Sequence, residues 1–179
     1  MKKITIFLIL LINCYWAQSQ QYMTRSGFIG FYGKTPLEDI RAENKQVYAI
    51  IDAGKKEMAI TLLLRGFIFT KELMQQHFNE NYVESDKYPK ASFTGTYTIN
   101  VPPGSDSIYK ITIKGNMTLH NVTRPVEIPA TLQMQQGRVL GNAEFKMKPE
   151  DYNITIPSLV RDKIAKEMNV VVKLDCSAK

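Results

Sequence analysis

Strict alternation of apolar and polar residues is the dominant pattern of this chain. It is clearest over residues 91–99 and 109–120, where apolar residues or glycine occupy every second position and Ser, Thr, Asn, Lys or His fill the others. Successive side chains of a β-strand point to opposite faces. The alternation therefore indicates strands with one dry face and one solvated face.

The same period recurs along most of the chain, with turn-forming residues between the alternating segments. Further strands are predicted over residues 24–32, 47–51, 58–64, 126–134, 139–147 and 168–176. Turns are predicted at residues 52–55, 102–106 and 135–137, each of which contains glycine. About eight strands with regular turn signals predict a single all-β domain, an antiparallel barrel or a sandwich.

Residues 70–82 depart from the period of two. Three apolar or aromatic side chains recur there at the spacing of one helix face: Met74, Phe78 and Tyr82. Thr70 is the predicted N-cap. We expect a short amphipathic helix that closes one side or end of the barrel. A second short helix is predicted over residues 158–166, directly after a proline.

The N-terminus has the three parts of a secretory signal peptide. Two lysines precede an apolar run at residues 4–12, and an Ala-Gln-Ser sequence ending at Ser19 offers a cleavage site. The run is too short to cross a bilayer, which needs about 20 residues. We expect a signal peptide over residues 1–19 and one mature domain over residues 20–179, located in the periplasm or secreted.

The two cysteines pose separate questions. Cys14 lies in the expected leader, and the Leu-Ile-Asn before it lacks the small residue that precedes a lipid-modified cysteine. This disfavours a lipid anchor and leaves lipidation of Cys14 open. Cleavage after Ser19 would leave Cys176 as the only cysteine. Its place in an alternating strand favours a small buried hydrophobic residue over a reactive thiol.

Charge argues against one large class of partners. The formal net charge of +6 falls to +4 when Lys2 and Lys3 are removed with the leader. The remaining basic residues are scattered, whereas nucleic-acid binding calls for a clustered basic face. We therefore expect no nucleic-acid partner. Weak, transient contact with an anionic membrane surface stays open, as does the oligomeric state.

The chain lacks the residue patterns of a catalytic or metal site. His77 and His120 are its only histidines, and zinc sites usually need three or four protein ligands with local spacing. No nucleophile or phosphate-loop motif occurs. The acidic residues at 79–87 alternate with Asn, Ser and Lys, which is typical of a solvated loop. We expect no metal, no cofactor and no enzymatic activity.

The inward faces of the predicted strands carry no charge, and they are rich in methionine and glycine. Small residues leave volume inside a barrel, and methionine adapts to irregular apolar partners. The candidate lumen-lining residues are Met58, Ile60, Leu62, Leu64, Phe93, Tyr97, Ile111, Ile113, Met117 and Phe145, with Met74, Phe78 and Tyr82 of the helix at the mouth. The alternative is a filled core, in which the glycines bend strands and the methionines fill gaps.

Four segments resemble the YceI-like family in order and in spacing. They are residues 67–69 (FIF), 73–82 (LMQQHFNENY), 84–93 (ESDKYPKASF) and 119–126 (LHNVTRPV). The resemblance covers about residues 22–176. Asn121 stands where the family has the glycine of an H-G-V-T turn, and Asn tolerates the left-handed backbone conformation better than other non-glycine residues.

The resemblance implies a lipocalin-like antiparallel β-barrel exported to the bacterial periplasm. It also implies a polyisoprenoid or another long-chain apolar lipid as partner, held in the lumen without a catalytic activity. The second hypothesis is a structural or stress-related interaction protein with a closed core and no ligand. The two hypotheses differ in whether the barrel interior is an open cavity that holds a ligand or is filled by the protein's own side chains.

Overall fold

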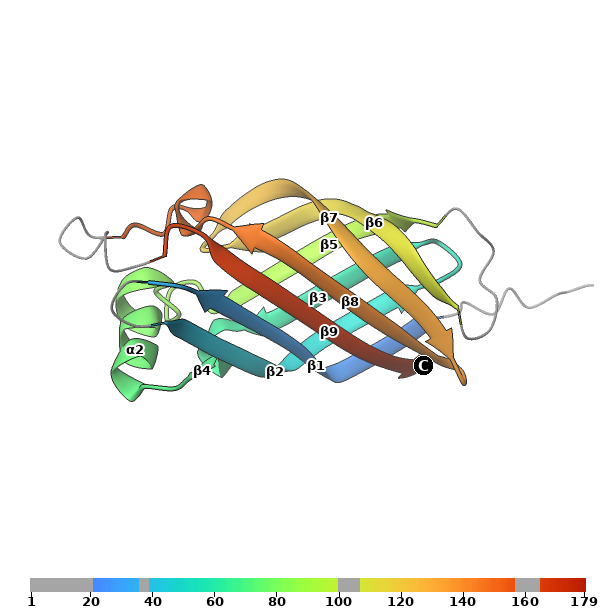
Figure 1. The fold of residues 1–179 in the computed structure, drawn as a ribbon, viewed down its shortest axis with the longest axis horizontal. Helices are drawn as coiled ribbons and strands as arrows, with labels where there is room; N and C mark the ends of the chain where they lie inside the picture. The colour runs from blue at the N-terminus through green and yellow to red at the C-terminus, as the bar shows by residue number, and fades with distance from the viewer. Residues whose placement is uncertain (1–20, 36–38, 100–106, 157–164) are drawn as a thin grey trace, which may run out of the picture.

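Eight long antiparallel strands close into one barrel in the computed structural model, which describes residues 21–35, 39–99, 107–156 and 165–179. The strands are β1 (Gln21–Gly33), β2 (Ile40–Asp52), β3 (Glu57–Leu63), β5 (Lys90–Thr98), β6 (Ile108–Leu119), β7 (Val122–Gln135), β8 (Arg138–Met147) and β9 (Met168–Ala178). Their order is β1-β9-β8-β7-β6-β5-β3-β2, and pairing of β1 with β2 closes the ring (Figure 1). This confirms the predicted antiparallel barrel.

Strand β2 is much longer than the predicted strand at residues 47–51. Its first half places Ala42 and Asn44 in the interior, both fully buried, before the buried positions resume at Val47. The spacing changes because the register against β1 shifts there. Asn44 is satisfied locally, since its Nδ2 donates to the Leu63 carbonyl at 3.0 Å. Because of this bulge and the buried Asn44, the first half of the strand does not show the alternation of apolar and polar residues that predicts a strand.

Two tight turns hold the hairpins of the second half together. In the β6–β7 turn, His120 and Asn121 have φ of 50° and 59°; in the β7–β8 turn, Gln136 and Gly137 have φ of 48° and 74°. Two successive residues with positive φ are typical of type I′ hairpins. Asn121 therefore adopts the left-handed conformation that its substitution for glycine predicts.

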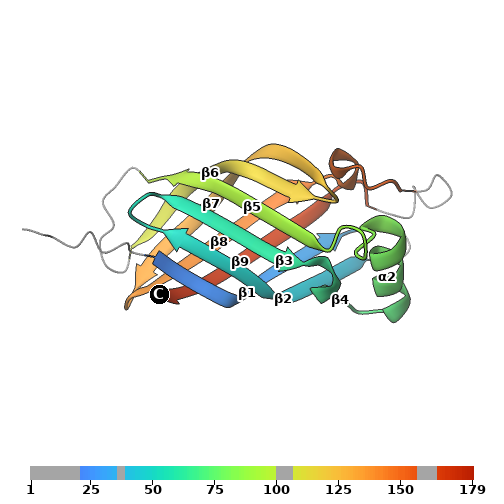
Figure 2. The ribbon, with the colours of Figure 1, turned by 180° about the vertical axis from the view of Figure 1, so that it is seen from behind.

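The predicted helix forms in two parts at one end of the barrel. Helix α2 (Glu72–His77) continues into a wider π-helical turn, η2 (Phe78–Tyr82), where the Val83 amide donates to the Phe78 carbonyl at 2.9 Å. Figure 2 shows α2 at the end of the barrel opposite the C-terminus. The prediction of Thr70 as N-cap is wrong: the cap is Lys71, which makes no capping side-chain hydrogen bond.

Shorter elements complete the described chain: η1 (Leu64–Gly66), β4 (Ile68–Phe69), which pairs with β2, and η3 (Pro149–Tyr152). The expected signal peptide, the turn at residues 102–106 and most of the second predicted helix lie outside the described residues. No helix in the described ranges is long and apolar enough to cross a membrane.

Candidate functional site

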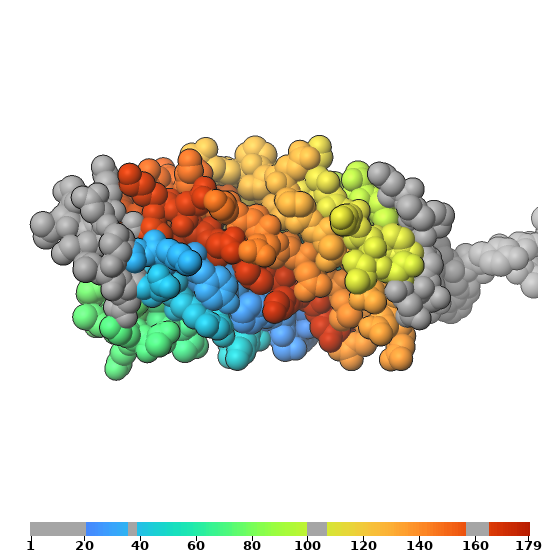
Figure 3. All heavy atoms as spheres, in the orientation of Figure 1, coloured from blue at the N-terminus to red at the C-terminus, as the bar shows by residue number. Residues whose placement is uncertain are grey.

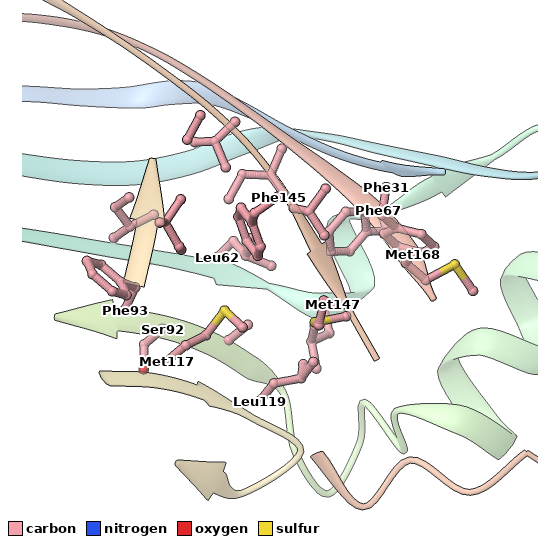
Figure 4. Close-up of a pocket in the computed structure, with 18 of the residues that line it drawn as sticks. Phe31, Leu62, Phe67, Ser92, Phe93, Met117, Leu119, Phe145, Met147 and Met168 are labelled. Atoms are coloured by element: carbon pink, nitrogen blue, oxygen red, sulfur yellow. The ribbon is translucent and has the colours of Figure 1, made fainter. Parts of the chain in front are cut away.

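The barrel encloses a cavity of about 450 Å³. All eight long strands contribute to its lining, together with residues of α2, η2 and the segment around η3. Figure 4 shows aromatic, aliphatic and methionine side chains converging on it. Among the described lining residues none is Asp, Glu, Lys or Arg. The predicted uncharged interior is therefore hollow rather than filled.

Most of the residues singled out from the sequence meet at this cavity. Those that line it are Met58, Ile60, Leu62, Leu64, Met74, Phe78, Tyr82, Phe93, Ile111, Ile113, Met117 and Phe145. The stripe of Met74, Phe78 and Tyr82 reaches the lumen from the end of the barrel where α2 lies. Contact of these residues with a ligand stays a prediction, whereas their convergence is a feature of the fold.

Tyr97 points inward as predicted but does not border the cavity. It belongs to a buried layer, with Tyr22, Val139 and Cys176, whose members do not line the open space. Burial raises the pKa of the Tyr97 phenol, and the nearby Asp52 and Tyr22 add to this effect. The Tyr97 amide donates to the Lys56 carbonyl at 3.0 Å, which places this layer at the β2–β3 turn, the barrel end opposite α2. This layer closes the cavity at its floor.

The glycines of the interior do not all leave free volume, contrary to the prediction. Gly95 of β5 and Gly115 of β6 are paired in register, and the Phe93 ring lies over both of them. A Cβ atom on Gly95 or Gly115 would come within 2.6 or 2.7 Å of Phe93 Cζ, and each would also collide with a carbonyl oxygen of the opposite strand. Gly141 differs, because it lines the cavity and its nearest neighbour would be 3.7 Å away.

Four phenylalanines form a cluster at the α2 end of the cavity. Five ring pairs among Phe31, Phe67, Phe69 and Phe78 have centroids 5.0–5.7 Å apart, all in tilted or edge-to-face arrangements. Three of the four were not among the predicted site residues. They come from β1, β4 and the segment before β4, which only the closure of the barrel brings together.

A polar cluster ties the segment after η2 to the β6–β7 turn. His120 Nε2 lies 2.9 Å from Glu84 Oε2, and His120 Nδ1 lies 3.2 Å from the Tyr152 carbonyl. The Tyr88 ring packs against the imidazole edge-on, with centroids 4.4 Å apart. The hydrogen bond to His120 lowers the pKa of the Glu84 carboxyl. The interpretation of residues 79–87 as merely a solvated loop is therefore wrong for Glu84.

The backbone pairing between neighbouring strands is less complete between β7 and β8 than between the strands on either side. The β7–β8 ladder runs from Gln135↔Arg138 to Ala130↔Ala143 and stops, although both strands are described throughout. On the other sides, β6–β7 pairing continues to Val122 and β8–β9 pairing to Met147. Pro125 and Pro129 lie on the stretch of β7 that has left β8, and proline cannot donate to a ladder.

Figure 1 shows β7 arching away from β8 over this stretch. The space-filling view shows the same face of the barrel with all heavy atoms (Figure 3). A surface hollow lies where the backbone hydrogen bonds end, and its lining includes Pro129, Ala130 and Ala143.

An antiparallel eight-stranded barrel around an uncharged interior cavity defines a lipocalin-like class of protein. The family model of the YceI-like domain matches residues 23–176, and the chain belongs to that family. No match was found among curated proteins.

Solved structures show the same fold at low sequence identity. A polyisoprenoid binding domain from Saccharophagus degradans, described as implicated in plant cell wall breakdown, has a TM-score of 0.77 and 13% identity, covering 90% of this chain and 100% of that one. BcnA of Burkholderia cenocepacia has a TM-score of 0.69 and 17% identity, covering 83% and 95%. The YCEI protein of Campylobacter jejuni has a TM-score of 0.65 and 14% identity, covering 82% and 89%.

Proposed function

We propose that this protein is a non-catalytic carrier that holds a polyisoprenoid or another long-chain apolar lipid in the barrel lumen. The observation that carries this proposal is the cavity of about 450 Å³ whose described lining has no ionised side chain of Asp, Glu, Lys or Arg. Ligand cavities in proteins commonly have volumes in this range and a mostly apolar lining.

Elementary energetics support an apolar chain as the occupant. Each buried CH₂ group contributes about 0.8 kcal/mol, so one five-carbon isoprene unit gains roughly 3–4 kcal/mol before the costs of association. A few buried units are enough for tight binding without a charged anchor. A polar ligand would instead leave its hydrogen-bonding groups unsatisfied against this lining.

The alternative, an interaction protein with a closed core, is less well supported. A core filled by its own side chains would leave no cavity of this size, because protein interiors contain few voids larger than a water molecule. The solved domain from Saccharophagus degradans, described as polyisoprenoid binding, has the same fold. This likeness adds support for a lipid ligand.

We further propose that the protein acts in the periplasm after cleavage behind Ser19. The lysines, apolar run and small-residue site of residues 1–19 support this proposal. N-terminal sequencing of the protein recovered from its host's periplasmic fraction would start at Gln20. Recovery of the intact N-terminus in the cytoplasmic fraction would contradict it.

Native mass spectrometry of the protein purified from its host tests the carrier function. We expect a mass above that of the polypeptide, and an extracted apolar molecule that accounts for the difference. Ala143→Trp places an indole in the lumen and should abolish this excess mass, whereas Thr96→Trp on the exposed face of β5 should leave it unchanged. Ligand-free wild type that also fails to bind added isoprenols would overturn the proposal.

A further inference from the structure

We propose that the surface hollow at the end of the β7–β8 ladder holds the polar head of the bound lipid, and that this head is a phosphate. The hollow is lined by residues 110–112 of β6, 129–131 of β7, 142–144 of β8 and 171–173 of β9. This inference rests on the proposed lipid-binding function and goes beyond it by assigning the place and the chemical class of the headgroup.

The surface hollow and the lumen meet at one level of the wall. Strand register places four inward-facing residues side by side across β6, β7, β8 and β9: Ile111, Ala130, Ala143 and Val172. All four line both the lumen and the surface hollow. The outward-facing Thr131 and Asn142, one residue away along β7 and β8, also line both. Because inward residues border the outer space and outward residues border the inner one, the two spaces communicate between β7 and β8.

The end of the β7–β8 ladder gives this opening its width. Ala130↔Ala143 is the last pair, and the next residues, Pro129 and Glu144, are not paired with each other. Paired strands lie about 4.8 Å apart, which leaves no space between their backbones. Beyond the last pair β7 arches away from β8 (Figure 1). Since alanine contributes only a methyl group at the edge of the opening, an apolar chain in the lumen reaches the surface here without meeting a bulky side chain.

The outer side of the surface hollow is polar and cationic. Four outward-facing residues lie in register across it: Lys110, Thr131, Asn142 and Lys173. Glu144 is the only acidic residue of the lining, and its Oε1 accepts a hydrogen bond from the Asn169 amide at 2.6 Å. Two ammonium groups on either side of a hydroxyl and an amide favour an anionic head with several acceptor oxygens. A phosphate monoester has this chemistry.

The two lysines are flexible donors at the rim of the surface hollow. Both are exposed, and three strand spacings of about 4.8 Å separate their positions. Lys173 Nζ lies 5.8 Å from the centroid of the Phe28 ring, so it turns from that ring toward the hollow when a phosphate is bound. Contacts of this exposed kind are screened by salt, which gives the proposal a second signature.

Binding of farnesol and of farnesyl phosphate to the purified, delipidated protein tests the inference. Both should bind the wild type. The phosphate should bind about tenfold more tightly at low salt, and this excess should shrink as salt is added. Lys110→Gln/Lys173→Gln should reduce the excess to about twofold or less. The matched control, Lys55→Gln/Lys90→Gln, removes the same charge from the β2–β3 turn and from the start of β5, and should keep the excess.

Amide resonances of the wild type locate the head. Replacing farnesol with farnesyl phosphate should shift the signals of residues 130–131 and 142–144 most, and those of residues 72–82 at the α2 end least. Inorganic phosphate alone should cause no such shifts, because the buried chain is what holds the head in the surface hollow.

Four results overturn the inference. Equal affinities for the two lipids would show that the surface hollow does not select a phosphate. An equal loss of the excess in the control variant would assign it to net charge. Shifts confined to residues 72–82 would place the head at the α2 end, and the expected shifts with inorganic phosphate alone would indicate a site for a free anion. Failure to bind either lipid would instead remove the proposed function, and is distinguished from these four by the absence of farnesol binding.

Discussion

The carboxylate of Glu84 and the imidazole of His120 are joined by a 2.9 Å contact that links two segments 36 residues apart. The Tyr152 carbonyl, 3.2 Å from the other ring nitrogen, can only accept a hydrogen bond. His120 Nδ1 therefore carries a proton, and an ionised Glu84 accepts from Nε2 when that nitrogen is protonated as well. The cluster fixes the β6–β7 turn against the loop that follows η2 and against η3.

The Glu84 contact should make stability depend on pH in the acid range. The pKa of Glu84 is lowered in the folded state, so its contribution is present above the unfolded-state value of about 4.3 and is lost as pH falls through the folded value. Glu84→Gln should lower the melting temperature at neutral pH, and the difference from wild type should vanish in acid. Thermal unfolding across pH measures this. Glu57→Gln, an exposed carboxylate on β3, is the control, and a similar loss there would count against a specific contact.

Gly115→Ala should destabilise the fold strongly. Its Cβ would collide with the Thr94 carbonyl and with the Phe93 ring, so two strands must separate; a cost of about 1–3 kcal/mol or more follows. Gly141→Ala is the matched change, since the nearest atom to its Cβ lies at 3.7 Å, and it should cost little. Urea denaturation of both variants compares them. Equal stabilities would refute the close approach of β5 and β6.

Asn121→Ala should destabilise the protein, whereas Asn121→Gly should not. At φ of 59°, alanine is strained by about 1–2 kcal/mol, whereas glycine adopts this conformation freely. Asn121→Gly should therefore leave the free energy of unfolding unchanged or raise it, and Asn121→Ala should lower it. Chemical denaturation measures the order of the three proteins. Alanine that proves as stable as glycine would contradict the left-handed turn.

The Cys176 thiol should be inert in the native protein. It is fully buried, and burial raises its pKa to about 11, so the nucleophilic thiolate is scarce at neutral pH. In a chain with Cys14→Ser, an aromatic disulfide reagent should react only after addition of denaturant, at a rate limited by unfolding. Fast labelling of the native protein would mean that the floor layer opens readily.

The sequence predicts which way most strand residues point, because alternation depends only on local backbone geometry. It does not show where along the barrel axis a residue lies. Tyr97 and Phe93 belong to the same inward series, yet one seals the floor and the other lines the cavity, since that difference depends on strand register around the closed ring. The first half of β2 is not predicted as a strand because its register against β1 shifts, which interrupts the alternation of buried and exposed residues.

Contacts between residues far apart in the sequence also cannot be predicted from the pattern of a single segment. Nothing near Glu84 indicates that His120 will face it, and nothing near Phe69 indicates that Phe31 will. The family motifs at residues 84–93 and 119–126 contain Glu84, Tyr88 and His120, and their joint presence is the one signal that could have paired them. The expectation that inward glycines leave free volume is wrong for Gly95 and Gly115, because residue spacing does not show that the Phe93 ring lies over them.

The early end of the β7–β8 ladder has a consequence for motion. Backbone that is hydrogen-bonded on one side only opens at a lower free-energy cost than backbone paired on both sides. Amide protons of residues 144–147 that point toward β7 should thus exchange with deuterium sooner than those that point toward β9, where the ladder is continuous. Opening of the barrel wall at this place is then set by the main chain of β7 and β8 rather than by the side chains that line the lumen.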